Sequence, residues 1–481
     1  MRSIGVNNLW QNLWNAHYQA KKFIKIKSVL EEQTNGSQFV KRSKAKQTES
    51  GSPKPDKDRN VDYNHRQVVG LWFGPLLFLL LFLMPNPTGM SESAQSILAS
   101  TAWIAVWWVS EAVPIPVAWL MPVVLFPITG SMPVSEVTAP YAKPNLFLFM
   151  GGFMIAACME KWNLHRRIAL LIISKVGTSP NRIVLGFMAA TGFLSMWISN
   201  TATTMMMLPV GVAVIAQVSN LTQENEHRGI DLKQGNFNFG TCLMLCIGYS
   251  ASIGGIATLI GTPPNIIFAG AAEEMFGVTI GFAHWMLFGL PLAVVFMYLT
   301  WLYMTRFAYP INLKEIPGSS EIINSEKEKL GPIGREEVMI AMIFALVALG
   351  WLVRPFLIEP FVPQVNDAMI AIFGAVLTFM VPVNIHKGAF LNDWQTAVKV
   401  PWGILLLFGG GLAIAAAFSS SGLALWIGTQ LSLLDGTSML LITLAVVALV
   451  KFLTEITSNT ATTSMMMPIM VAMAAAMGVQ P

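Results

Sequence analysis

This sequence has little charge. Of its 481 residues only 12% are Asp, Glu, Lys or Arg, while 54% are hydrophobic and the mean hydropathy is +0.57. A soluble domain carries about twice that share of charged residues. The deficit excludes an ordinary soluble protein, and the small net charge of +4 gives no indication of a nucleic-acid partner. Apolar runs long enough to cross a bilayer recur, so we predict a polytopic membrane protein surrounded by lipid.

Cysteine and histidine are also scarce. The three cysteines, Cys158, Cys242 and Cys246, lie in apolar runs, where we expect small core residues rather than a disulfide or a metal pair. The six histidines have no metal-binding spacing, and no nucleophile elbow, phosphate loop or zinc motif occurs. The sequence therefore predicts neither an enzyme nor a protein with an organic cofactor.

What the sequence does contain is an internal duplication. The pentapeptide Ser-Asn-Thr-Ala-Thr occurs at 199–203 and again at 458–462, which is 259 positions later. At the same offset Gly151-Gly152 matches Gly410-Gly411, and Ser195 matches Thr454. Several matching blocks in one register indicate a repeated unit rather than a chance pentapeptide.

The chain before the first apolar run is polar and basic. Residues 1–66 contain 13 Lys and Arg against 6 Asp and Glu, so they are predicted to be a mostly flexible cytoplasmic tail rather than a signal peptide. The remainder divides into four predicted parts: scaffold spans at 67–144, the rest of repeat one at 145–280, scaffold spans at 281–401 with a cytoplasmic loop at 307–336, and repeat two at 402–481.

Apolar runs predict the membrane-crossing helices. Continuous spans are expected near 68–85, 96–110, 113–130, 145–160, 282–306, 337–357, 366–384 and 402–427, with a basic amphipathic segment at 161–181. Three further runs are interrupted by polar residues: 182–217 by Ser199-Asn200-Thr201, 239–271 by Gly-Thr-Pro-Pro-Asn at 261–265, and 438–478 by Ser458-Asn459-Thr460.

The two Ser-Asn-Thr runs are too short on either side of the break to cross the membrane twice. About 16 apolar residues flank Asn200 on each side, against roughly 20 for one crossing. Unwound backbone at membrane depth is tolerated only inside protein or beside a wet cavity. We therefore predict two re-entrant helical hairpins with Ser-Asn-Thr at their tips. The alternative, for either run alone, is a kinked helix with back-bonded Ser and Thr.

The basic residues predict the orientation. With the tail inside and each hairpin returning to its own side, 27 of the 30 Lys and Arg fall in inside segments, and only Lys143, Arg354 and Lys451 fall elsewhere. The chain is thus predicted to be a multi-pass protein of the plasma (inner) membrane with a cytoplasmic N-terminus. The first hairpin then enters from inside and the second from outside, so the repeats are inverted.

Inverted repeats with broken helices are typical of transporters. Half-helix N-termini offer partial positive charge and free N–H groups to an anion, whereas unwound carbonyls and helix C-termini suit Na⁺ or H⁺. Neutral oxygens that suit a hard monovalent cation occur at both breaks: Ser195, Ser199 and Asn200 at the first, and Thr454, Ser458 and Asn459 at the second.

These motifs, in this order, resemble the divalent anion/Na⁺ symporter family, which handles dicarboxylates, citrate and sulfate. The resemblance covers roughly 68–481. It rests on both Ser-Asn-Thr-Ala-Thr segments, on Gly-Thr-Pro-Pro-Asn at 261–265, on Trp-Trp-Val-Ser-Glu-Ala-Val-Pro-Ile-Pro at 107–116 and on Met-Glu-Lys-Trp-Asn-Leu-His at 159–165. It implies an all-α fold, usually homodimeric, in which a hairpin-bearing domain moves against a fixed scaffold in an elevator-like motion.

The same resemblance implies the site residues. Substrate carboxylates are expected on Asn200, Thr201, Thr262, Asn459 and Thr460. The first Na⁺ site is expected to use Ser195, Ser199, Asn200 and Gly261, and the second Thr454, Thr457 and Asn459. The implied function is secondary-active, Na⁺-coupled import of a di- or tricarboxylate, with a C4-dicarboxylate such as succinate as first choice. Na⁺/sulfate symport and Na⁺-independent dicarboxylate exchange are the alternatives within this class.

One departure from the repeat lies at the C-terminus. In repeat one the Gly-Thr-Pro-Pro-Asn break begins 62 residues after Ser199, so its partner would begin near position 520, whereas the sequence ends at Pro481. We therefore expect the end of repeat two, and part of the second Na⁺ site, to be missing from this sequence. A truncated, non-transporting remnant or a regulatory partner is the alternative of another class.

Overall fold

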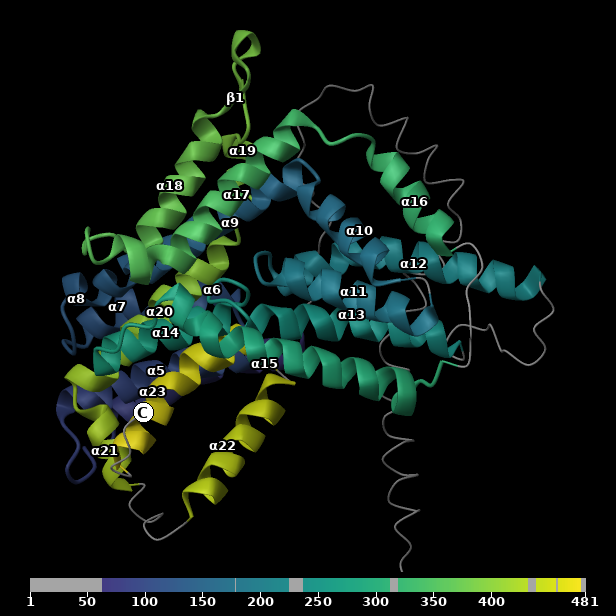
Figure 1. The fold of residues 1–481 in the computed structure, drawn as a ribbon. Helices are drawn as coiled ribbons and strands as arrows, with labels where there is room; N and C mark the ends of the chain where they lie inside the picture. The colour runs from purple at the N-terminus through teal and green to yellow at the C-terminus, as the bar shows by residue number, and fades with distance from the viewer. Residues whose placement is uncertain are drawn as a thin grey trace, which may run out of the picture. The chain divides into compact units, whose positions relative to one another are not determined.

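The computed structural model describes residues 63–177, 179–224, 237–311, 319–430, 438–455 and 457–476. Nearly all of this part of the chain is α-helical (Figure 1). Most of the predicted tail at 1–66 lies outside the described residues, and its last two residues, His65 and Arg66, already belong to the first helix described.

In the first half of the chain the elements are α4 (His65–Leu83), α5 (Glu92–Ser110), α6 (Ile115–Ala118), α7 (Met121–Ile128), α8 (Val134–Thr138), η1 (Ala139–Ala142), α9 (Pro144–Lys161), α10 (Leu164–Val176), α11 (Pro180–Ser195), α12 (Asn200–Glu224), α13 (Asn238–Ile256) and α14 (Pro263–Phe276). In the second half they are α15 (Phe282–Tyr303), η2 (Met304–Ala308), α16 (Ser319–Leu330), α17 (Arg335–Val353), η3 (Arg354–Ile358), α18 (Asp367–Met380), β1 (Pro382–Asn384), η4 (Ile385–Lys387), β2 (Ala389–Phe390), α19 (Trp394–Ala397), α20 (Trp402–Ser420), α21 (Leu423–Gln430), α22 (Met439–Thr454) and α23 (Asn459–Ala476).

Helices of membrane-crossing length confirm the polytopic class. Within the described residues, six helical segments are long and apolar enough to cross a bilayer: His65–Leu83, Val134–Lys161, Asn238–Ile256, Phe282–Ala308, Arg335–Ile358 and Trp402–Ser420. The described strands are the short antiparallel pair β1 and β2, which forms a hairpin between α18 and α19. The chain is therefore an all-α integral membrane protein.

Two of the predicted spans are interrupted, and the predicted loop contains a helix. The expected span 113–130 is wrong as one helix, because it consists of α6 and α7 separated at Trp119 and Leu120. This run contains Pro114, Pro116, Pro122 and Pro127, which cannot donate backbone hydrogen bonds. The expected span 402–427 is divided at Gly422, whose φ of +77° suits glycine. The expected loop 307–336 contains α16.

The three predicted helix breaks are confirmed. Helix α11 ends at Ser195 and α12 begins at Asn200. Helix α13 ends at Ile256 and α14 begins at Pro263. In repeat two, α22 ends at Thr454 and α23 begins at Asn459. Both Ser-Asn-Thr motifs therefore lie where one helix ends and the next begins.

The duplicated glycine pairs mark close approaches between helices. On α9, a Cβ at Gly151 would lie 2.7 Å from the backbone of Ala371 in α18. On α20, a Cβ at Gly410 would lie 2.3 Å from the carbonyl oxygen of Trp119, just after α6. In both places the missing side chain lets α9 and α20 pack directly against the backbone of a neighbouring segment.

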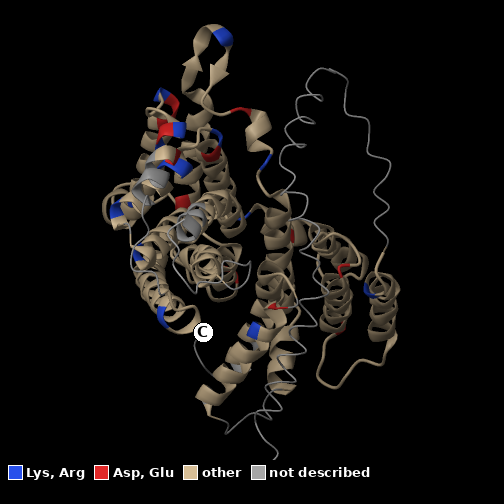
Figure 2. Ribbon diagram, turned by 90° about the vertical axis from the view of Figure 1, so that its right-hand side faces the viewer, with Lys and Arg blue, Asp and Glu red and all other residues tan. Residues whose placement is uncertain are grey.

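Ion pairs gather where α10 meets α16 and α17. Arg167 Nε lies 2.7 Å from Glu337 Oε2, and Arg166 Nη2 lies 2.7 Å from Glu326 Oε2. The hydrogen bond from Lys329 holds the pKa of Glu326 below its usual range, against the effect of burial. Figure 2 shows such charged patches beside long stretches of uncharged helix. The basic amphipathic segment is therefore a separate helix held by carboxylates.

Candidate functional site

The first break is closed by local hydrogen bonds. The backbone N–H groups of Met196 and Trp197 donate to carbonyls at the end of α11, which turns the chain tightly after Ser195. Ser199 Oγ accepts from the N–H of Ala202 at 3.3 Å, so Ser199 caps the start of α12. The Ser-Asn-Thr order thus provides a cap followed by the first residues of a new helix.

The linker of the first break is anchored by aromatic packing. Met196, Trp197 and Ile198 are buried. The Trp197 ring stacks on Phe282 at 6.0 Å between centroids and meets Phe344 edge-on at 4.9 Å. Since α15 and α17 supply these two rings, the linker is fixed against both helices.

Thr258 ties the first break to the second. Its hydroxyl donates to the carbonyl oxygen of Met196 at 2.5 Å and accepts from the N–H of Gly261 at 3.0 Å. The two unwound segments, 196–199 and 257–262, therefore lie side by side. Thr258 was not among the predicted site residues, because a threonine in an apolar run carries no signal of such a contact.

Asn265 donates hydrogen bonds to backbone carbonyls at the C-terminal end of α13. Its Nδ2 donates to the carbonyl oxygens of Gly255 at 2.9 Å and Thr258 at 2.7 Å, and it lies 3.4 Å from that of Ile256. These are carbonyls that a broken helix leaves without helical partners. Asn265 belongs to the Gly-Thr-Pro-Pro-Asn motif, but no role was predicted for its side chain.

Four oxygen-bearing groups converge between the two breaks. Ser195 Oγ donates to the carbonyl oxygen of Ala251 at 2.7 Å and lies 2.7 Å from the Asn200 amide. The amide atom of Asn200 that faces Ser195 Oγ also lies 3.1 Å from the Ala251 carbonyl oxygen and 3.3 Å from the Gly261 carbonyl oxygen. The structure thus brings together Ser195, Asn200 and Gly261, three of the residues expected at the first Na⁺ site, and Ala251 of α13 joins them.

This cluster suits a hard monovalent cation. It consists of a hydroxyl, an amide and two backbone carbonyls, and Ser195 is fully buried. No group of three or more His, Cys, Asp or Glu that could hold a metal occurs in the described part of the chain. Neutral oxygen ligands favour an alkali cation over a transition metal.

The other residues predicted at the first tip lie nearby with free polar groups. Thr201 is exposed beside Asn200 in the first turn of α12. Thr262 is half-buried and extended immediately before α14, and its side chain makes no capping hydrogen bond. The N-terminus of α12 therefore offers N–H groups and a hydroxyl that suit an anion.

In the second hairpin, the predicted site residues bond within their own hairpin. The Thr454 hydroxyl donates to the Lys451 carbonyl at 2.8 Å, and Thr457 donates to that of Leu453 at 2.8 Å. Asn459 is exposed and Thr460 is half-buried. Among the described residues, no backbone carbonyls from another helix join them as Ala251 and Gly261 join Ser195.

Packing places the second hairpin against the broken helix of repeat one. Helix α23, which begins at Asn459, contacts α14, which follows the Gly-Thr-Pro-Pro motif. Ala202 of the first tip packs against the same hydrophobic cluster that contains Ala461 of the second. The two Ser-Asn-Thr motifs therefore border one core.

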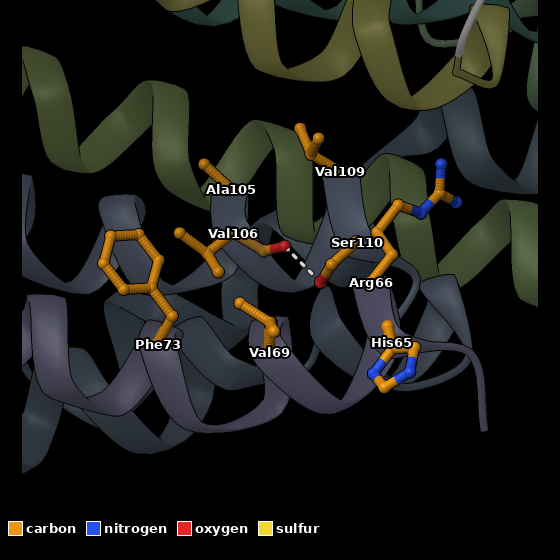
Figure 3. Close-up of a pocket in the computed structure, with 9 residues that line it drawn as sticks. His65, Arg66, Val69, Phe73, Ala105, Val106, Val109 and Ser110 are labelled. Carbon is orange, nitrogen blue, oxygen red and sulfur yellow. Dashed lines mark hydrogen bonds between the residues drawn. The ribbon is translucent and has the colours of Figure 1, made fainter.

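A groove elsewhere in the molecule does not fit a dianion. It has a volume of about 580 Å³ and lies between α4 and α5, with an apolar lining that includes Val69, Phe73 and Val106 (Figure 3). The hydroxyl of Ser110 at one end is hydrogen-bonded to the Val106 carbonyl. His65 and Arg66 also line this groove, and Arg66 is paired with Glu111, so the groove lacks the convergent neutral donors present at the helix breaks.

Comparison with known proteins identifies the family of this chain. The chain is 45% identical over 430 residues to SdcS, a sodium-dependent dicarboxylate transporter of Staphylococcus saprophyticus. The matched region covers 89% of this chain and 82% of that protein. It is 44% identical over 418 residues to the SdcS protein of Staphylococcus aureus, covering 86% of this chain and 79% of that one. A family model described as the sodium:sulfate symporter transmembrane region matches residues 65–481. The chain belongs to this sodium:sulfate symporter family.

Proposed function

We propose that this protein is a secondary-active symporter that imports a C4-dicarboxylate such as succinate together with Na⁺. The observation that carries the proposal is the oxygen cluster of Ser195, Asn200, Ala251 and Gly261 between two helix breaks. The two staphylococcal relatives, named as sodium-dependent dicarboxylate transporters, support this choice of substrate and ion.

The substrate site in this proposal lies between the two tips. Asn200, Thr201 and Thr262 take one carboxylate, and Asn459 and Thr460 take the other, through amide, hydroxyl and helix N-terminal donors. An extended dicarboxylate suits donors on two separate hairpins better than a compact anion does.

Two Na⁺ sites complete the proposal. Ser195, Ser199, Asn200 and Gly261 serve the first, and Thr454, Thr457 and Asn459 serve the second. If more positive than negative charge enters per cycle, each net charge adds about 2.3 kcal/mol of inward drive per 100 mV. The proposed protein is a homodimer with a cytoplasmic N-terminus, and its hairpin-bearing part moves across the bilayer.

Uptake by purified protein tests this function. The chain is reconstituted in proteoliposomes, and radiolabelled succinate uptake is measured with an inward Na⁺ gradient and with an equal K⁺ gradient. We expect succinate uptake with the Na⁺ gradient and none with the K⁺ gradient. Asn200→Ala and Asn459→Ala are expected to reduce it at least tenfold while the amount of reconstituted protein stays the same.

Sulfate is the second candidate substrate, because the matching family model is described by sodium:sulfate symport. An excess of unlabelled sulfate is added to the same assay, and labelled sulfate is tested directly. Sulfate uptake that requires Na⁺, without succinate uptake, would replace the dicarboxylate assignment. Equal succinate uptake in both gradients would rule out Na⁺ coupling.

A further inference from the structure

The groove between α4 and α5 lies on the lipid-facing surface of the molecule. Helix α4 is long and apolar enough to cross the bilayer, and its only buried residues are Gly70 and Gly74. The side chains of Val69 and Phe73, which line the groove, are 63% and 47% exposed. Within the hydrocarbon core such exposed apolar side chains contact lipid chains rather than water. The groove is therefore open to the bilayer.

Close packing between α4 and α5 fixes the walls of the groove. A Cβ at Gly70 would lie 1.9 Å from Ser110 Oγ, and a Cβ at Gly74 would lie 2.6 Å from Cδ1 of Trp103. Small residues one turn apart let two membrane helices approach closely. The backbone of α4 thus rests directly on side chains of α5, and the groove beside this contact is part of the fold.

The groove is apolar along most of its length and cationic at one end. Figure 3 shows Phe73 and Ala105 toward one end, and His65 and Arg66 at the other. His65 and Phe73 are eight positions apart, which is about 12 Å along a helix. The hydrocarbon of one leaflet is about 15 Å deep, half of a core of about 30 Å. The groove therefore extends over most of the depth of one leaflet.

The cationic end has hydrogen-bond donors for a phosphate. Arg66 Nη2 lies 3.4 Å from Glu111 Oε2, and both side chains are about half exposed, so water weakens this ion pair. A carboxylate engages at most two of the five N–H groups of a guanidinium, which leaves the others for phosphate oxygens. His65 adds a ring N–H at the same end. The predicted orientation places this end at the cytoplasmic leaflet, where basic residues attract anionic lipids.

We propose that this groove is the binding site of one anionic phospholipid. The phosphodiester lies at Arg66 and His65, and one acyl chain runs along Val69 and Phe73 toward the middle of the bilayer. A small dianion does not fit the groove, because most of the lining is apolar. A phospholipid does fit, because its charge is at one end and its hydrocarbon follows. The site is separate from the helix breaks and does not depend on which anion the protein transports.

Native mass spectrometry of the detergent-solubilised full chain tests the head-group contact. Phosphatidylglycerol and phosphatidylcholine with the same acyl chains are added in equal, sub-saturating amounts. We expect wild-type protein to carry phosphatidylglycerol at least fivefold more often than phosphatidylcholine, and Arg66→Gln to lower this ratio below twofold. Arg335 is the matched control, because it is an exposed arginine at the start of another membrane-crossing helix, α17, and does not line the groove. Arg335→Gln is expected to keep the wild-type ratio.

Glu111→Gln distinguishes lipid binding from a structural role of the ion pair. If Arg66 serves only to fasten α4 to Glu111, removal of either partner has the same consequence. In the proposed site the Glu111 carboxylate competes with the phosphate for the guanidinium and repels it. Glu111→Gln is therefore expected to leave the lipid ratio at least as high as in the wild type, whereas Arg66→Gln lowers it.

Ala105→Trp tests the acyl-chain part of the site without changing a charge. Ala105 is half-buried and lines the groove, so an indole at this position occupies the space of the chain. We expect the fraction of protein that carries phosphatidylglycerol to fall at least threefold. Leu79→Trp, at an exposed position of α4 that does not line the groove, is expected to keep the wild-type fraction. Size-exclusion chromatography shows whether each variant is folded.

Several results would overturn the lipid site. Equal binding of the two phospholipids by wild-type protein is one, and equal ratios for Arg66→Gln and Arg335→Gln are another. Displacement of phosphatidylglycerol by glycerol phosphate at the same concentration would mean that the site takes phosphate without a chain. A lipid-free dimer that dissociates in Ala105→Trp but not in Leu79→Trp would assign the groove to a second copy of the chain instead.

Discussion

At the scale of single residues, Asn265 joins the two parts of the broken helix in repeat one. It is buried, and its amide donates to carbonyl oxygens at the end of α13 at distances of 2.7 and 2.9 Å. In Asn265→Ala these acceptors lose their partner, and each buried polar group left unpaired costs roughly 1–3 kcal/mol. We expect a loss of about 2 kcal/mol in the free energy of unfolding, measured in detergent micelles titrated with a denaturing detergent.

Asn238 is the matched control at the other end of α13. Its Nδ2 also donates to a carbonyl, that of Pro310, at 3.2 Å, but the side chain is exposed. Asn238→Ala is expected to change the free energy of unfolding by less than about 0.5 kcal/mol. Equal losses for the two variants would mean that capping of the broken helix does not stabilise the site.

At the scale of secondary-structure elements, α10 is fastened to the start of α17 by one arginine. Arg167 binds Glu337 through Nε at 2.7 Å and Nη2 at 3.3 Å, and its Nη1 donates to the Gly331 carbonyl at 3.1 Å. The two side chains are only 17% and 10% exposed. Such a pair contributes orientation as well as energy, because the planar guanidinium fits the carboxylate in one geometry.

Removing that arginine leaves a nearly buried carboxylate without its partner. Arg167→Ala is expected to lower the free energy of unfolding by about 3 kcal/mol, at the lower end of the range for broken buried pairs. Arg66→Ala breaks the pair with Glu111, whose side chains are about half exposed, and is expected to cost less than about 1 kcal/mol. The same detergent titration checks both variants, and a small effect of Arg167→Ala would mean that α10 is held by its apolar face alone.

At the scale of the whole molecule, the distribution of basic residues predicts which ends of the helices face the cytoplasm. Phe361, between α17 and α18, is 82% exposed and belongs to a segment predicted outside. Lys387, in the turn between β1 and β2, is exposed and belongs to a segment predicted inside. The three native cysteines are buried, so they should give little background labelling.

Cysteine labelling tests this orientation. In intact cells, Phe361→Cys is expected to react with a membrane-impermeant maleimide, whereas Lys387→Cys is expected to react only after permeabilisation. Reaction of both in intact cells would contradict the predicted crossing between them, and the reverse pattern would invert the whole topology.

The class of the protein, the positions of its helix breaks and its family follow from the amino-acid sequence without any structure. Low charge and long apolar runs specify a membrane protein, because backbone groups in lipid must pair within helices. Ser199 caps α12, and Pro263 and Pro264 begin α14, so these breaks follow from local chemistry. The Ser-Asn-Thr motif recurs 259 residues later in the chain, so the breaks at its two copies can be recognised from the sequence alone.

The groups that surround Asn200 depend on how the helices pack. Every residue has a backbone carbonyl, so no sequence pattern marks that of Ala251, which becomes a neighbour of Ser195 only when α13 packs against α11. Gly261 was expected at this site from the family resemblance alone. The same packing gives Gly255 its role, since a glycine matters there only because the amide of Asn200 lies against it. Helix breaks are local in origin, whereas the oxygen cluster arises from packing between segments that are far apart in the chain, since Ser195 and Ala251 are separated by 56 residues.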